Sequence, residues 1–219
     1  MEERIGSYPN AKKGINRIFL GELIAILGMV IIAIGSGILA VKGQTMTDLS
    51  TYTSGANIAA LVILIGGLMV LVAFLFKFFG ISKASIDEGD FKKAMALLVI
   101  GFVASIVHSA VDGRIEVVAE IANIITNVCE LLVTIFIISG IKSLAEKVND
   151  RHVFDMCNRT YKLIIAVYVL IIALTVVALF VTNETMAVIA GLIALAIAIL
   201  AIVAIIVFLS LLNNARKML

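Results

Sequence analysis

Six long apolar stretches divide the chain, and the polar residues collect between them. None of these stretches alternates between apolar and polar positions with the period of two that is typical of a β-strand. A bilayer core about 30 Å thick needs about 20 residues of α-helix, which rises about 1.5 Å per residue. Each stretch reaches or approaches that length. We therefore predict transmembrane helices at residues 18–41, 57–80, 94–111, 117–141, 163–182 and 186–212.

The composition also favours a membrane protein. The hydrophobic fraction is 62%, against roughly 45–50% in soluble proteins, and only 15% of the residues are charged. A soluble domain could not cover so much apolar surface, and no segment between the stretches is long enough to fold alone. We predict an all-α, polytopic membrane protein with an N-terminal segment (residues 1–17), one six-helix domain (18–212) and a short tail (213–219).

Lys and Arg are unevenly divided between the two predicted sides of the membrane. If the six helices form three antiparallel hairpins, fifteen of the 17 basic residues fall on the side of the two termini. Only Lys42 and Arg114 fall on the other side. Cytoplasmic segments of helical membrane proteins carry an excess of basic residues. We therefore predict a multi-pass protein of a cell membrane with both termini in the cytoplasm.

Small residues recur at seven-residue intervals, or at alternating intervals of four and three, along five of the predicted helices. In lipid, apolar surface alone does not drive helices together, so contacts favour small residues that let backbones approach. A seven-residue repeat on a helix with 3.6 residues per turn favours left-handed crossing at about +20°. We expect a left-handed bundle whose small-residue stripes face inward or meet a second protomer. The stripes are Gly21, Gly28, Gly35; Ala59, Gly66, Ala73, Gly80; Ala94, Gly101; Ala166, Ala173; and Ala187, Gly191, Ala194, Ala198, Ala201.

The fourth stretch carries a row of polar residues on one face. Spacings of four and three place the row within an arc of about 80° and along about 27 Å, nearly the depth of the hydrocarbon core. Charged side chains at that depth cost about 2.5–3.5 kcal/mol each, so we expect the row to face protein and not lipid. The row consists of Glu116, Glu120, Asn123, Asn127, Glu130 and Thr134.

The third stretch is the expected partner of this row. If the third and fourth helices are antiparallel about a short turn, His108 lies level with Glu120, and Ser105 lies level with Asn123. A His–carboxylate pair can hold or pass a proton, because His titrates near neutral pH. The same pair can equally be a static hydrogen bond that fixes the hairpin.

Two acidic residues, Glu22 and Glu130, fall in the half of the membrane nearer to the predicted cytoplasmic side. Arg17 and Lys77 lie close enough in depth to neutralise Glu22, which is one interpretation. The other is that the two carboxylates together bind a cation or a proton.

No motif of nucleotide binding, metalloprotease or serine-hydrolase chemistry occurs, so we expect no enzyme, cofactor or metal ion. The net charge of +2 does not favour nucleic-acid binding. The leading hypothesis is a small transport, channel or ligand-capture protein with a polar path between the third and fourth helices. The alternative is a structural or accessory membrane protein that oligomerises, or docks a partner membrane protein, through its small-residue faces. The lipid bilayer is the expected surrounding in both cases.

Overall fold

The computed structural model describes residues 8–45, 49–111, 113, 115–178 and 184–219. These residues form helices joined by short turns, and no strand occurs among them. The helices are α1 (Pro9–Thr45), α2 (Leu49–Ala84), α3 (Asp90–Val111), α4 (Glu116–Lys147), α5 (Arg151–Ala178) and α6 (Glu184–Met218). Five of the six predicted stretches lie wholly within one helix each. The fifth stretch, 163–182, runs past the end of α5, and residues 179–182 lie outside the described part.

Within the described residues, six helices are long and apolar enough to cross a membrane. Large apolar side chains on several of these helices are more than 60% exposed, among them Leu64, Ile172 and Leu192. So much exposed apolar surface is not tolerated in water but is suited to contact with lipid. The helices thus indicate a multi-pass membrane protein.

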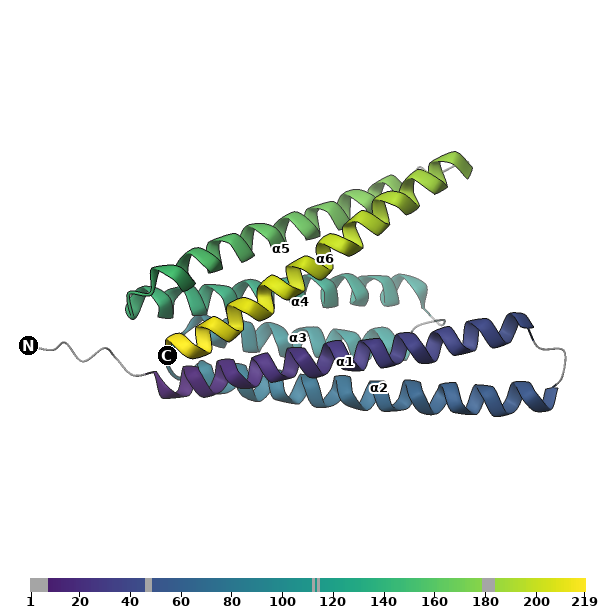
Figure 1. Cartoon of the computed structure of the whole chain (residues 1–219), viewed down its shortest axis with the longest axis horizontal. Helices are drawn as coiled ribbons and strands as arrows, with labels where there is room; N and C mark the ends of the chain where they lie inside the picture. Colours follow the sequence, from purple (N-terminus) through teal and green to yellow (C-terminus); the bar gives the residue numbers. More distant parts are fainter. Residues whose placement is uncertain (1–7, 46–48, 112, 114, 179–183) are drawn as a thin grey trace, which may run out of the picture.

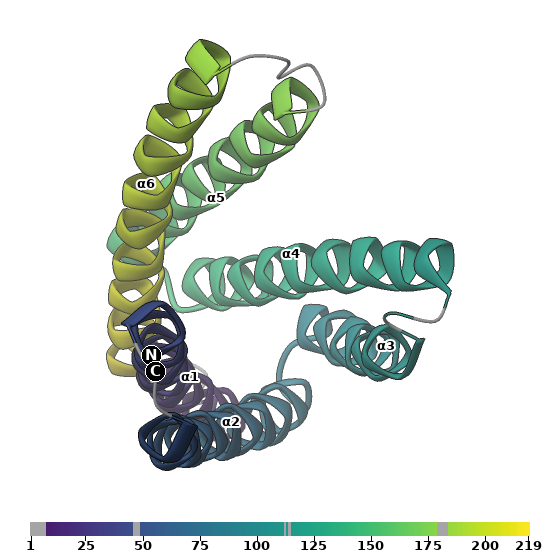
Figure 2. The same cartoon turned by 90° about the vertical axis from the view of Figure 1, so that its right-hand side faces the viewer.

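Consecutive helices lie side by side in three pairs: α1 with α2, α3 with α4, and α5 with α6 (Figures 1 and 2). The start of α1, the end of α6 and the turns α2–α3 and α4–α5 lie together at one end, which we call the common end (Figure 1). From the common end the three pairs spread apart. The α5–α6 pair diverges from the α3–α4 pair toward the opposite, far end (Figure 2).

The apolar core lies at the common end and contains residues of all six helices. Phe91 of α3 is fully buried there, and its ring occupies the space above Gly140 of α4. A Cβ atom on Gly140 would lie 2.6 Å from that ring, so the glycine is needed for the contact. Other fully buried members of the core are Ile15, Ile18, Ile81, Ile137, Ile141, Leu144, Leu211 and Leu212.

The backbones of α1 and α2 touch at seven-residue intervals. A Cβ atom on Gly66 would lie 2.8 Å from the carbonyl oxygen of Gly28, too close for any side chain. The predicted stripes of the first two helices therefore pack against each other within the chain. The opposed pairs are Gly14 with Gly80, Gly21 with Ala73, Gly28 with Gly66, and Gly35 with Ala59.

The stripes predicted on the last two helices do not pack in this way. Ala166, Ala173, Gly191 and Ala198 are exposed. A Cβ atom on Gly191 would meet nothing within 4 Å. The side chain of Ala187 lies outside the described part of the chain.

The Gly66→Leu substitution is expected to destabilise the protein, because the new side chain would force α1 and α2 apart. Overpacking of this kind costs roughly 1–3 kcal/mol, and we expect the melting temperature in detergent to fall by several degrees. Gly67→Leu is the matched control, since a Cβ atom at that position meets nothing within 4 Å. Equal melting temperatures for the two variants would contradict the backbone contact.

Hydrogen bonds across the common end tie α1 to the α2–α3 turn and to α6. The carboxylate of Asp87 accepts a bond of 2.8 Å from the backbone N–H of Ala11 and one of 3.0 Å from the amide of Asn10. Asp87 thereby satisfies a free N–H group at the start of α1, where a negative charge is also favourable. The guanidinium of Arg216 in α6 donates to the side-chain oxygen of Asn16 at 2.8 Å.

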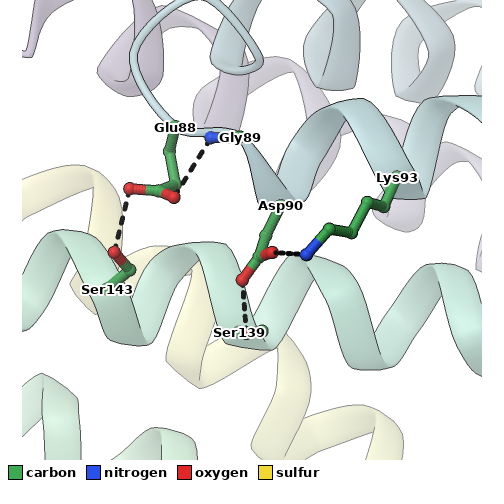
Figure 3. A network of polar contacts seen from close by, with 6 residues as sticks. All are labelled: Glu88, Gly89, Asp90, Lys93, Ser139 and Ser143. Atoms are coloured by element: carbon green, nitrogen blue, oxygen red, sulfur yellow. Dashed lines mark hydrogen bonds and ion pairs between the residues drawn. The ribbon is translucent and has the colours of Figure 1, made fainter.

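The same turn and the first residue of α3 are bound to α4 by two further carboxylates (Figure 3). The hydroxyl of Ser139 donates to Asp90 at 2.6 Å, and the hydroxyl of Ser143 donates to Glu88 at 2.9 Å. The ammonium of Lys147 also donates to Glu88, at 2.5 Å. Burial alone would raise the pKa of Glu88, but the bonds from Lys147 and Ser143 outweigh it and hold that pKa below its ordinary value.

Glu88→Gln is expected to lower the melting temperature at pH 7 by a few degrees. The loss is about 1 kcal/mol, because Lys147 stays partly exposed. A carboxyl whose pKa is lowered by folding stabilises the protein fully above its ordinary pKa of 4.5, and this contribution disappears as the pH falls through the lowered value. The difference between wild type and variant should therefore shrink below about pH 4.5.

Thermal unfolding in detergent from pH 7 to pH 3 measures this difference. Glu146→Gln is the control, since Glu146 lies on the same end of α4 and is exposed. A difference between wild type and Glu88→Gln that stayed constant over the whole series would contradict the lowered pKa.

Candidate functional site

A cavity of about 500 Å³, which we call the first cavity, adjoins the core on its far side and is lined by all six helices. Val133, Ile164 and Phe208 belong both to the core and to the cavity wall, so the cavity begins where the core ends. Most of its lining is apolar. The polar side chains on its wall are Glu22, Lys77, Glu130, Thr134 and Tyr168.

Glu22 of α1 and Lys77 of α2 form an ion pair in the first cavity. The ammonium of Lys77 lies 2.6 Å from a carboxylate oxygen of Glu22, and the two side chains are 24% and 19% exposed. The glycine contact explains the pairing, because Gly21 lies directly against Ala73 and brings the two backbones together one turn from Lys77. Of the two bases expected near Glu22, it is Lys77 that forms the ion pair.

Glu130 enters the same cavity from α4. The preceding residue, Cys129, is buried against Gly101 of α3, and one step along a helix turns the side chain by about 100°. Glu130 is exposed, and among the described residues no hydrogen bond or ion pair to its carboxylate is found. Lys77 and Tyr168 are within electrostatic range of it. Glu130 therefore presents an unpaired carboxylate beside the Glu22–Lys77 pair.

A second cavity of about 370 Å³ lies between α2, α3 and α4. It shares five lining residues with the first cavity, including Glu130 and Phe74, so the two cavities are neighbours. Ser105 lines the second cavity. The rings of Phe74 and Phe102 stack across α2 and α3 with centroids 4.5 Å apart at its wall.

The expectation that the polar row of α4 packs against α3 is wrong. The buried residues on this part of α4 are Ala119, Ala122 and Cys129, each one position before a member of the row. These small side chains let α3 and α4 approach closely, whereas the row lies about 100° further round the helix.

His108 accordingly does not meet Glu120. The Nδ1–H of His108 donates to the backbone carbonyl oxygen of Ala119 at 3.0 Å, and Glu120 is exposed. The predicted level of His108 is right to within one residue, but the predicted facing of α4 is not. His108 thus makes a hydrogen bond between α3 and α4, but not to the predicted carboxylate.

The predicted site residues are thus divided among four places. Two members of the row, Asn123 and Asn127, are exposed and joined by a side-chain bond of 3.4 Å. The side chain of Glu116 lies outside the described part of the chain. Glu22 and Glu130 share the first cavity, Ser105 and Glu130 share the second, His108 lies at the α3–α4 contact, and Glu120, Asn123 and Asn127 are exposed on α4.

Tyr168 and Thr134 line the cavity but were not predicted as site residues. Thr134 is the last residue of the polar row, so the sequence pattern already included it. Its hydroxyl donates to the carbonyl oxygen of Glu130. Tyr168 is a tyrosine among the aliphatic residues of α5, and this isolated position is the one sequence signal for it. Which helix faces α5 cannot be read from that signal.

Comparison of the chain with protein-family models, with curated proteins and with solved structures finds no match. The class of protein is indicated by the helices themselves, since six apolar helices among the described residues are compatible with an integral, multi-pass membrane protein.

Lys77→Met is expected to lower the melting temperature, because it leaves the carboxylate of Glu22 partly buried without a cation. Breaking a fully buried pair costs about 3–5 kcal/mol, and we expect less because both side chains keep about a fifth of their surface exposed. Adding Glu22→Gln should recover most of the loss, since replacing both partners is often nearly neutral. A double variant that melts as low as Lys77→Met, or lower, would contradict the ion pair.

Proposed function

We propose that the protein is a small transport protein, a channel or carrier, that takes a solute into the first cavity. The observation that supports this most directly is the meeting of Glu22, Lys77 and Glu130, from three different helices, in a cavity of about 500 Å³ with otherwise mainly apolar walls. Ionisable residues at membrane depth are costly and are typical of ion and substrate pathways. Sites between the helices of a bundle are a common place for small-molecule binding.

The route that we propose runs along α4 from the first cavity toward the far end. Glu130, Asn127, Asn123 and Glu120 lie on one face of α4. All four side chains are exposed, and Glu130 also lines the cavity. This route replaces the path predicted between α3 and α4, where Ala119, Ala122 and Cys129 are buried in place of the polar row.

The topology belongs to the same proposal. The six helices cross a cell membrane as three antiparallel hairpins in a left-handed bundle, and the common end with both termini faces the cytoplasm. By the hairpin arrangement of the sequence, fifteen of the 17 basic residues fall on the side of the two termini, which supports the orientation. The first cavity is then nearer to the cytoplasm than to the outside.

Reconstituted vesicles test the proposal. We expect gradients of protons, Na⁺, K⁺ or a methylated ammonium ion to drive currents through the wild type, recorded on a solid-supported membrane. Glu130→Gln should reduce the active current at least tenfold because it removes the unpaired charge of the cavity, and Glu120→Gln should reduce it less. Glu146→Gln, on an exposed part of the same helix, should leave it unchanged. Wild-type currents in both the Glu130 and Glu120 variants would exclude this route.

The second candidate is a structural or accessory membrane protein that oligomerises or docks a partner membrane protein without transport. It is favoured by the exposure of Asn123 and Asn127 on α4 and of the small residues of α5 and α6. Amides exposed at membrane depth gain hydrogen bonds when another helix covers them. A wild-type protein that carries no current but is a stable oligomer in lipid nanodiscs would favour this candidate.

A further inference from the structure

We propose that the solute of the first cavity is an organic cation with an apolar body, and that Glu130 is its counter-ion. This inference depends on the proposed function, because it assumes that the first cavity is the solute site. It names the chemical class of the ligand, which follows from the charge, the walls and the size of the cavity.

The charge of the cavity favours a cation. Its charged side chains are Glu22, Lys77 and Glu130, and the first two neutralise each other at 2.6 Å. Glu130 therefore leaves one uncompensated negative charge on the wall. In a medium of low dielectric constant such a charge binds an opposite charge much more strongly than it would in water. An anion would meet only Lys77, whose charge Glu22 already neutralises.

The walls of the cavity do not suit a bare metal cation. Metal cations such as Na⁺, K⁺ and Ca²⁺ are held by several oxygen ligands, about six to eight in the case of Ca²⁺. Among the described residues no group of three or more His, Cys, Asp or Glu side chains is close enough to hold a metal ion. Met29, Phe74, Leu98 and Phe208 instead present apolar surface on several sides. Such walls suit a ligand whose positive charge is attached to hydrocarbon.

Aromatic rings strengthen the case for a cation. Phe74, Tyr168 and Phe208 line the same cavity as Glu130. The faces of aromatic rings attract organic cations, and the attraction grows when water is excluded. One carboxylate among aromatic and aliphatic side chains is a suitable setting for an ammonium or phosphonium group.

The size of the cavity is that of a drug-like molecule. Ligand pockets commonly have volumes of about 300–1,000 Å³, and the first cavity has about 500 Å³. The second cavity, which Glu130 also lines, adds about 370 Å³ of largely apolar space. A ligand bound to Glu130 can therefore extend its apolar groups into either cavity.

Equilibrium binding of radiolabelled tetraphenylphosphonium to the purified protein in lipid nanodiscs tests this inference. Tetraphenylborate has nearly the same shape and the opposite charge, and it serves as the matched ligand. Empty nanodiscs give the amount of each ion that dissolves in lipid. We expect saturable binding of tetraphenylphosphonium, at least tenfold weaker binding of tetraphenylborate, and at least tenfold weaker binding of tetraphenylphosphonium to Glu130→Gln.

Two further variants show whether the charge itself is responsible. Glu130→Asp keeps the charge and should retain binding within about tenfold of the wild type, and Glu146→Gln should bind as the wild type does. Equal affinity for the two ions, or unchanged binding of tetraphenylphosphonium to Glu130→Gln, would overturn the inference. So would loss of binding in Glu146→Gln as complete as that in Glu130→Gln.

The two proposals can fail separately. Currents of protons, Na⁺ or K⁺ that depend on Glu130, together with no preference for tetraphenylphosphonium over tetraphenylborate, would refute the ligand class and leave the transport function standing. Selective, Glu130-dependent binding of tetraphenylphosphonium without a current of any tested cation would refute transport and support the ligand class.

Discussion

Close contact between helix backbones decides where the polar side chains of this protein lie. Lipid offers helices little gain from burying apolar surface, so they meet where small residues allow the backbones to touch. The opposed glycines and alanines of α1 and α2 form one such contact, and Ala119, Ala122 and Cys129 against α3 form the other. The first contact sets Lys77 beside Glu22, and the second turns Glu130 into the first cavity.

The two ends of the bundle are held by different means. At the common end, a core from all six helices is reinforced by the carboxylates of Asp87, Glu88 and Asp90, each hydrogen-bonded to a neighbouring helix. Toward the far end the three pairs separate (Figure 2). The first cavity lies at the boundary between these two regions, where fixed side chains border an opening space.

The helices and the opposed stripes of α1 and α2 could be predicted from the sequence, because length, hydropathy and a seven-residue repeat are local properties. The level of His108 beside the start of α4 followed from the short turn between α3 and α4. The facing of α4 could not be predicted, since polar and small residues occupy adjacent positions along it, and only the fit against α3 selects the small ones. The partners of the acidic residues Asp87, Glu88 and Asp90 could not be predicted either, because they come from α1 and α4, which lie far away in sequence.

The bond between Asn16 and Arg216 has a consequence for assembly, because its two residues are 200 positions apart in the chain. A chain made on the ribosome emerges from its N-terminus, and its early parts can fold before the rest exists. The α1–α2 pair can form at once, whereas the contact of α1 with α6 at the common end forms only after α6 has been inserted. During that interval the core around Ala11, Ile15 and Ile18 of α1 lacks the side chains that α6 contributes to it. The chain is therefore incompletely packed in the membrane until its last helix is inserted.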